Sequence, residues 1–303
     1  MANKVTVLGS LNVDTILQIK RLPQPGETML MSNKQNAGGG KGANQAIAAA
    51  RAGATTAFIG KVGQDENGRM MTGLLNEAQI DTSQITLTDQ GTGQAFILLQ
   101  ESGENSILVY GGANQTIERE DILNARLTIE ASDFLIAQFE TPIEQTLLAF
   151  NLAQQAGVTK ILNPAPAQTV PAELLSLVDL LVPNETEAEI LTGIKVVDAQ
   201  SQQAAALKLQ SMGVKNVIIT LGSQGAYYRC GQKEGLVPAF KVNAVDTTAA
   251  GDTFLGSLAS QLKKDLSNIE EAILFANKAS SLAVQKMGAI PSIPTYAEIK
   301  ADF

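Results

Sequence analysis

The chain has 303 residues, a formal net charge of −8 and 45% hydrophobic residues, which is ordinary for a packed globular protein. The absence of histidine excludes Ser-His-Asp hydrolases, Cys-His proteases and histidine-ligated zinc sites, and leaves proton transfer to carboxylates, Lys, Tyr or Cys. The acidic balance disfavours nucleic-acid partners, and a single cysteine forbids an internal disulfide, which suits the cytoplasm. No stretch approaches the ~20 apolar residues of a membrane span, and the N-terminal apolar run is too short for a signal peptide.

Short β-favouring runs alternate along the chain with segments rich in Ala, Gln and Leu, four of which end at a glycine. The runs predict strands at 4–9, 57–60, 133–139, 160–163, 180–183 and 216–221. The longer segments predict helices at 42–52, 68–78, 143–156, 185–192, 202–212, 252–264 and 269–287. This alternation predicts an α/β protein, a Rossmann-like three-layer sandwich around a mostly parallel sheet.

Two segments, approximately 12–37 and 91–112, lack helical periodicity and interrupt the alternation. Within the second, residues 94–99 and 106–110 flank Ser102-Gly103-Glu104, which predicts a β-hairpin. We expect these segments to form a small β-sheet lid at the edge of the main sheet. The chain has no fixed-period repeat or low-complexity linker, so we expect residues 1–303 to form one domain.

The strongest chemical signal is the run Asp246-Thr-Thr-Ala-Ala-Gly-Asp252, in which small residues precede a predicted helix. The first amides of a helix lack internal partners and lie at the positive end of its dipole, so residues 249–251 are expected to bind a phosphate. A carboxylate at Asp252 does not help to bind an anion, and its chemical role would be to accept a proton from an attacking hydroxyl. The alternative interpretation is an ordinary N-cap aspartate, and the residues alone favour neither.

Two polar, glycine-containing segments predict a polyol site. Residues 37–44 match neither a Walker A loop nor a dinucleotide fingerprint, but they lead into a helix and carry Lys41 and Asn44. Asn12 and Asp14 follow the first strand and, two residues apart, face the same side of an extended chain. A flexible turn and an Asx turn are the structural alternatives for these two segments.

Two further segments predict contacts to a nucleotide. Asn184 and Glu187, three apart at a helix start, could bind Mg²⁺ through waters, although the same spacing is that of a capping box. The glycine-rich turn at 220–225 follows a strand and could admit a ribose and phosphates, although alone it is a weak signal.

These motifs occur together in an order that resembles the ribokinase and PfkB-type sugar kinase family over nearly the whole chain. The resemblance is carried by GSLNVD, GGGKGANQA, NPAPA, PNETEAEILTG, TLGSQGAY and VDTTAAGDTFLGSL, of which the last is highly specific. It implies ATP-dependent phosphorylation of D-ribose at O5, giving D-ribose 5-phosphate and ADP. It also implies a homodimer joined through the β lids.

The resemblance assigns roles to individual residues. The general base is Asp252, and the anion hole is formed by Ala249, Ala250 and Gly251. The sugar-binding residues are Asn12, Asp14, Gly40, Lys41, Gly42, Asn44, Glu140 and Asp252. The nucleotide-binding residues are Asn184, Glu187, Thr220, Gly222, Ser223, Gly225, Gly251 and Asn277, with Glu187 tied to Mg²⁺. The loops that hold an activating K⁺, several through backbone carbonyls, contain Asp246, Thr248, Ala283, Lys286, Gly288 and Ser292.

Two rival functions remain at this point. Another kinase of the family would act on deoxyribose, a nucleoside or a hexose derivative; the 4% aromatic content disfavours a nucleoside, while deoxyribose differs from ribose by one hydroxyl. A non-catalytic sugar sensor would bind the same ligands without turnover, and an intact Gly251-Asp252 pair argues against it.

Overall fold

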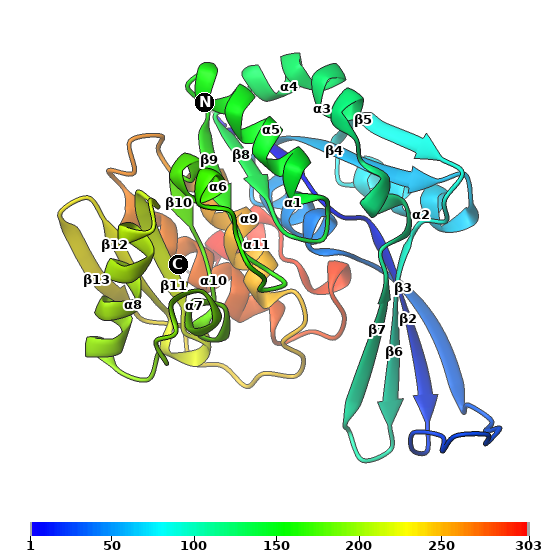
Figure 1. Ribbon diagram of the computed structural model, residues 1–303. Coiled ribbons are helices and arrows are strands. Elements are labelled where there is room, and N and C mark those ends of the chain that lie inside the picture. Colours follow the sequence, from blue (N-terminus) through cyan, green and yellow to red (C-terminus); the bar gives the residue numbers. More distant parts are fainter. Residues whose placement is uncertain (1, 302–303) are drawn as a thin grey trace.

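The computed structural model describes residues 2–301 (Figure 1). Its larger sheet has the strand order β13-β12-β11-β10-β9-β8-β1-β4-β5, parallel from β11 to β5, with β12 and β13 antiparallel. The strands are β1 (Lys4–Leu8), β4 (Thr55–Gly63), β5 (Asp81–Thr88), β8 (Phe134–Ala137), β9 (Thr159–Leu162), β10 (Leu180–Leu181), β11 (Asn216–Thr220), β12 (Ala226–Cys230) and β13 (Lys233–Val237). The predicted α/β class with a large, mostly parallel sheet is confirmed.

Helices cover both faces of this sheet, so its central strands are apolar on both sides. In β8, Leu135 and Ala137 pack into one core and Ile136 packs into the other. The core that contains Ile136 is covered by α1 (Lys41–Arg51), α2 (Glu66–Glu77), α9 (Ala250–Gln261) and α10 (Ile269–Ala283). The opposite core is covered by α3 (Arg119–Asn124), α4 (Arg126–Glu130), α5 (Ile143–Gln155), α6 (Ala172–Leu177), α7 (Glu185–Thr192) and α8 (Ala199–Ser211).

A separate four-stranded sheet of order β3-β2-β6-β7 projects from the body of the molecule (Figure 1, lower right). It comprises β2 (Asn12–Ile19), β3 (Asn33–Gly39), β6 (Gly93–Gln100) and β7 (Asn105–Tyr110). Strands β6 and β7 pair antiparallel, so the predicted hairpin is confirmed. Most of β7 is exposed, and this edge strand presents apolar side chains to solvent.

Several elements were not predicted from the sequence, and all predicted helices except the one at 185–192 differ from the observed helices by one or more residues at an end. The missed elements are β5, β12, β13, α3, α4, α6, α11 (Tyr296–Ala301) and three short 3₁₀ turns at Gly112–Thr116, Gly222–Gln224 and Ile290–Ser292. The helix predicted over 252–264 begins two residues earlier, at Ala250, and ends at Gln261. The helix predicted over 269–287 ends at Ala283, because the next carbonyl, that of Val284, accepts hydrogen bonds from the amides of Val245 and Asp246. No helix within residues 2–301 is long and apolar enough to cross a membrane.

Candidate active site

A polar groove of about 210 Å³ lies where β9, β10 and β11 end and α9 begins. Ligands of open α/β sheets bind at this carboxyl edge of the strands. The groove is lined by Lys41, Asn163, Ala165, Val182, Asn184, Glu187, Thr220, Thr247, Ala249, Ala250, Gly251, Asp252 and Leu255. It therefore brings together Lys41, the start of α9 and the polar residues after β10 and β11.

The first turn of α9 leaves main-chain donors open to the groove. The N-cap is Ala249, which adopts a left-handed conformation with φ 60°. The N-cap interpretation of Asp252 is thus wrong, since Asp252 is the third residue of the helix. Within the described chain, the amides of Ala249 and Gly251 have no acceptor, whereas that of Ala250 donates to the Thr247 carbonyl at 3.2 Å. Two of the three predicted anion-hole amides are free to receive an anion.

The Asp252 carboxylate lies between α9 and α1 and is only 8% exposed. Its Oδ2 accepts a hydrogen bond from Asn44 Nδ2 at 3.0 Å, and its Oδ1 accepts one from Gln45 Nε2 at 2.8 Å. Asn44, which the sequence analysis assigned to the sugar, thus lies at the carboxylate, while Gln45 was not singled out from the sequence. The Oδ1 of Asn44 is buried without a partner among residues 2–301, as expected for an atom that binds a ligand.

Asp14 extends the acidic side of the site. Its carboxylate lies directly over Gly39, where a Cβ would come within 2.3 Å of Oδ2. Burial, followed by the nearby charges of Glu140 and Asp252, raises the pKa of Asp14 to about 6. Lys41 balances these charges: burial acts to lower its pKa, but Asp252, Glu140 and Glu187 together raise it. Asp14, Lys41 and Asp252 thus form one electrostatic cluster.

Hydrogen bonds between loops hold the remaining predicted sugar-binding residues in place. Glu140 Oε2 accepts from the Lys41 amide at 3.0 Å and from Ser10 Oγ. The Oδ1 of Asn12 accepts from Asn114 Nδ2 at 2.8 Å, which leaves the Asn12 NH₂ for a ligand. Gly40 and Gly42 allow close approach of the two chain segments, since Gly40 has φ 92° and the Gly42 amide donates to Ser10 Oγ. Ser10 lies in the GSLNVD motif but was not singled out from it, and Asn114 carried no recognisable sequence signal.

Asn184 and Glu187 form the capping box at the start of α7. The Glu187 amide donates to Asn184 Oδ1 at 2.8 Å, and the Asn184 amide donates to Glu187 Oε2 at 2.9 Å. The structural alternative is therefore present, and Glu187 Oε1 lies outside the capping box. Burial raises the pKa of Glu187, although the hydrogen bond from the Asn184 amide and the positive charge of Lys41 act to lower it. Both residues line the groove, so one pair combines a helix cap with the wall of the site.

The rest of the predicted nucleotide side extends beyond the groove. Thr220 lines it, whereas Gly222 and Ser223 lie in the 3₁₀ turn that follows β11 and Gly225 caps that turn. Asn277 donates both side-chain hydrogen bonds to the carbonyls of Val237 and Pro238, each at 3.1 Å. Its amide therefore shapes the 237–238 loop, and its NH₂ is already occupied.

Comparisons with known proteins identify this arrangement. Residues 2–296 match the pfkB family of carbohydrate kinases. The chain belongs to the pfkB family of carbohydrate kinases. A ribokinase from Staphylococcus aureus (strain COL) is 52% identical over 301 residues, covering 99% of each chain. A deoxyribokinase from Salmonella typhimurium (strain LT2) is 34% identical over 296 residues, covering 97% of this chain and 96% of its own. The structure of Arabidopsis thaliana ribokinase complexed with ribose and ATP has a TM-score of 0.92 at 34% identity, covering 99% of this chain and 98% of its own.

In this carbohydrate kinase, the predicted cation loops meet around Asp246. One carboxylate oxygen accepts from the amide and hydroxyl of Thr248, at 2.9 and 2.6 Å, and the other accepts from the Gly288 amide at 2.8 Å. Burial acts to raise the pKa of Asp246, but these hydrogen bonds to the carboxylate outweigh burial, and the pKa is lowered. The Lys286 side chain pairs with Glu298 at 3.0 Å, so its ammonium group has a different partner.

Two other predicted cation-loop residues, Ala283 and Ser292, make local hydrogen bonds. The Ala283 carbonyl accepts a hydrogen bond from the Lys286 amide, and Ser292 Oγ donates to the Ala289 carbonyl at 2.7 Å. The oxygens that the predicted cation loops offer thus belong to carboxylate, carbonyl and hydroxyl groups, the kind of ligand that suits a hard cation.

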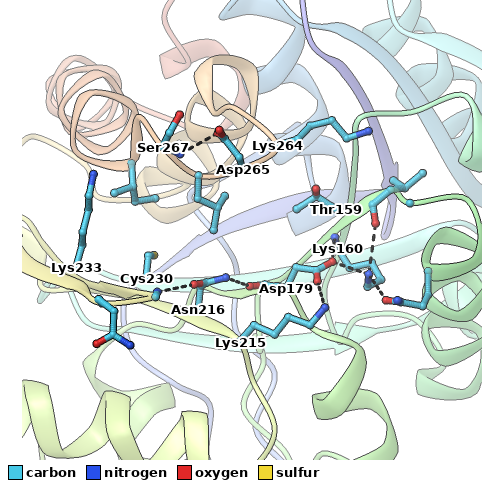
Figure 2. A pocket seen from close by; sticks show the side chains of 17 residues that line it. Thr159, Lys160, Asp179, Lys215, Asn216, Cys230, Lys233, Lys264, Asp265 and Ser267 are labelled. Carbon is cyan, nitrogen blue, oxygen red and sulfur yellow. Dashed lines mark hydrogen bonds and ion pairs between the residues drawn. The ribbon is translucent and has the colours of Figure 1, made fainter.

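A larger hollow of about 660 Å³ lies at the opposite edge of the kinase, near the amino ends of β9, β10 and β11 (Figure 2). Its base is an ion-pair network in which Asp179 binds Lys160 at 2.5 Å and Lys215 at 2.6 Å. Burial acts to raise the pKa of Asp179, but the hydrogen bonds from the two lysines outweigh burial, and the pKa is lowered. Burial also raises the pKa of Cys230 in this hollow to about 12, so the thiol is unreactive near pH 7. This hollow contains none of the predicted site residues.

Proposed function

We propose that the protein transfers the γ-phosphoryl group of ATP to O5 of D-ribose, giving D-ribose 5-phosphate and ADP. The observation that carries the proposal is the start of α9, where the buried Asp252 carboxylate lies beside free main-chain amides in a groove. Family membership supports phosphoryl transfer to a carbohydrate. The greater identity to a ribokinase, 52%, than to a deoxyribokinase, 34%, supports ribose as the acceptor.

The proposed reaction uses the groups on each side of the groove. Asp252 accepts the proton of the sugar 5-hydroxyl while that oxygen forms a bond to the γ-phosphorus, and the bond from phosphorus to the leaving oxygen of ADP breaks. The amides of Ala249 and Gly251, at the positive end of α9, stabilise the charge on the transferring group. Asn12, Asp14, Asn44 and Lys41 hold the sugar, and Glu140 orients Lys41 through its amide.

The small sheet is the proposed lid of this single carbohydrate-kinase domain. Its strand β2 carries Asn12 and Asp14, so movement of the sheet would carry sugar-binding groups with it. Closure over the sugar would exclude water from the groove and limit hydrolysis of ATP. The buried, unreactive Cys230 is consistent with action in the cytoplasm.

Mg²⁺ would be held chiefly by the nucleotide. Within residues 2–301, no group of three or more Asp, Glu, His or Cys residues gathers round a metal position. Kinases commonly bind Mg²⁺ through substrate phosphates, waters and one or two carboxylates. Glu187, which lines the groove and keeps one oxygen outside its capping box, fits that role. When bound, Mg²⁺ supplies positive charge to the phosphates.

We propose that the loops around Asp246 hold an activating K⁺. Asp246 connects residues 246–248 to Gly288, and residue 249 is the N-cap of α9, so a cation here would order the anion-binding turn. Activity is therefore expected to be higher in K⁺ than in Na⁺ buffers at fixed ionic strength, measured by ADP release with saturating ribose and ATP. Equal rates in both salts would contradict the proposed cation site.

We also propose a homodimer formed through the lids. The exposed edge strand β7 of the small sheet carries Ile107, Leu108 and Val109, of which the last two are each 63% exposed. Exposed apolar side chains gathered along one strand are typical of protein interfaces. Val109→Glu is expected to shift the mass in multi-angle light scattering from dimer to monomer. Leu127→Glu, at a 78% exposed position on α4, is the matched control and should remain dimeric; a monomeric parent protein would contradict the proposal.

The function is tested by a coupled ADP-release assay across pentoses with MgATP. We expect kcat/KM to be highest for D-ribose. A higher value for 2-deoxyribose would assign the alternative acceptor, and ribose binding without ADP release would assign a sensor.

A further inference from the structure

The side-chain amide of Gln45 is fully buried, and both of its polar atoms are engaged. Its Nε2 donates to Asp252 Oδ1 at 2.8 Å and to Asn163 Oδ1 at 3.2 Å. Its Oε1 accepts a hydrogen bond from Gln138 Nε2 at 2.6 Å. An amide NH₂ has two hydrogens, so this arrangement uses every donor that Gln45 has.

The partners of Gln45 fix the direction in which its amide points. An ionised Asp252 carboxylate can only accept a hydrogen bond. Asn163 uses its own NH₂ to reach the Val182 carbonyl at 3.1 Å, so its oxygen faces Gln45. Both neighbours therefore require the NH₂ of Gln45, and rotating the amide by 180° would place oxygen against oxygen at two contacts.

The backbone of Gln45 is as firmly placed as its side chain. Helices α1 and α9 touch at Gly256, where a Cβ would lie 2.3 Å from the Gln45 carbonyl oxygen and 2.6 Å from Ala48 Cβ. Gly256 lies one turn after Asp252 on α9. The distance between the Gln45 amide and the carboxylate is thus set by direct backbone packing.

We propose that Gln45 is a positioning residue for the phosphoryl transfer, which rests on the proposed role of Asp252. By donating to Oδ1, Gln45 fixes the carboxylate plane and reserves Oδ2 as the oxygen that receives the proton of the sugar hydroxyl. Oδ2 is the oxygen on the side of Asn44, whose own unpartnered Oδ1 marks the ligand side. Gln138 supports the arrangement from behind by holding Gln45 Oε1.

The first test is Gln45→Met, which nearly keeps the side-chain volume and removes the donor. Because Asn44 alone then holds the Asp252 carboxylate, its plane is no longer fixed, and kcat is expected to fall about 10- to 100-fold, the scale of misplacing a reacting group. KM for ribose and for ATP should stay within about threefold, because neither substrate contacts Gln45 in the proposed site. Gln202→Met, at a buried glutamine on α8 in the opposite core, is the matched control and should keep the parent kcat.

The decisive measurement combines Gln45→Met with Asp252→Asn. If Gln45 acts through the carboxylate, its substitution should lower kcat by less than about threefold in the Asp252→Asn background. An equal loss in both backgrounds, or an unchanged kcat in Gln45→Met alone, would overturn the positioning role.

Gln45→Glu retains the side-chain shape and should also lower kcat, because it places a second carboxylate against Asp252. A kcat equal to that of the parent protein in this variant would also overturn the positioning role. Normal activity of Asp252→Asn by itself would instead refute the base assignment.

Discussion

Asp252→Asn is expected to lower kcat for ribose phosphorylation by at least ~100-fold, which is the scale of general-base catalysis. The carboxylate is the group in the groove that can take the hydroxyl proton beside the open amides of α9. Asparagine has nearly the same shape and no basic oxygen of that kind. The measurement is steady-state ADP release with saturating ribose and MgATP.

The same substitution disturbs the local hydrogen bonds, and this effect has to be separated from the chemistry. Asn44 and Gln45 both donate to Asp252, so the NH₂ of an asparagine would face a donor at one of the two contacts. An unpaired buried donor costs about 1–3 kcal/mol of stability. Circular dichroism should therefore show a folded protein with a lowered Tm. Calorimetry should show that ribose affinity is largely retained. A folded variant with near-normal kcat would remove Asp252 from its proposed role.

Asp14→Asn is expected to lower kcat/KM for ribose about 10- to 100-fold, because hydrogen bonds to a charged group contribute about 1.5–3 kcal/mol. The pKa of about 6 adds a pH signature. In the parent protein, kcat/KM for ribose should fall as the pH drops below about 6 and Asp14 becomes protonated. This part of the pH dependence should be absent from the variant.

The effect of Asp14→Asn on stability should have the opposite sign. A carboxyl whose pKa is higher in the folded than in the unfolded state opposes folding when it is ionised, above its folded pKa. Its replacement should therefore raise the free energy of unfolding at pH 8 by up to about 3 kcal/mol, before solvent screening reduces it, and so raise Tm; both should change little at pH 4. Asp179→Asn is the contrasting control: its pKa is lowered, so it should destabilise the protein at pH 8 and leave kcat/KM unchanged. A lower Tm for Asp14→Asn at pH 8 would contradict the proposed charge cluster.

The alternating strands and helices of the large sheet could be predicted from the sequence because these elements bury continuous apolar faces. Helix α7 was predicted with both ends as observed, since Asn184 caps one end and Gly193, with φ 74°, ends the other. The missed strand β5 alternates polar residues with only half-buried ones, as an edge strand does, and so lacked an apolar signal. Helix α10 ends early because the carbonyl of the next residue, Val284, accepts a hydrogen bond from the amide of Val245, which lies 39 residues before Val284 and which the local sequence pattern does not encode.

Some residues of the candidate site could be predicted from the sequence, and others only from the tertiary structure. Asp252, Asn44 and Lys41 belong to compact motifs, and the fold brings them together as predicted. Gln45 lies in one of those motifs but resembles any polar helix residue until the packing of α1 on α9 places it at the carboxylate. Asn114 is 102 residues from its partner Asn12, so only the three-dimensional arrangement reveals the pair. The number and direction of hydrogen bonds at Asp252 likewise depend on tertiary contacts.

The backbone contact at Gly256 separates the molecule into parts that can change independently. Because α1 and α9 have no space to slide past each other there, the machinery for the chemical step is assembled before any substrate arrives. In the proposed reaction, the projecting strands meet the acceptor through a different set of side chains, Asn12 and Asp14. Altering those strands offers a route to new acceptor alcohols in the laboratory or in evolution, with the nucleotide half left intact.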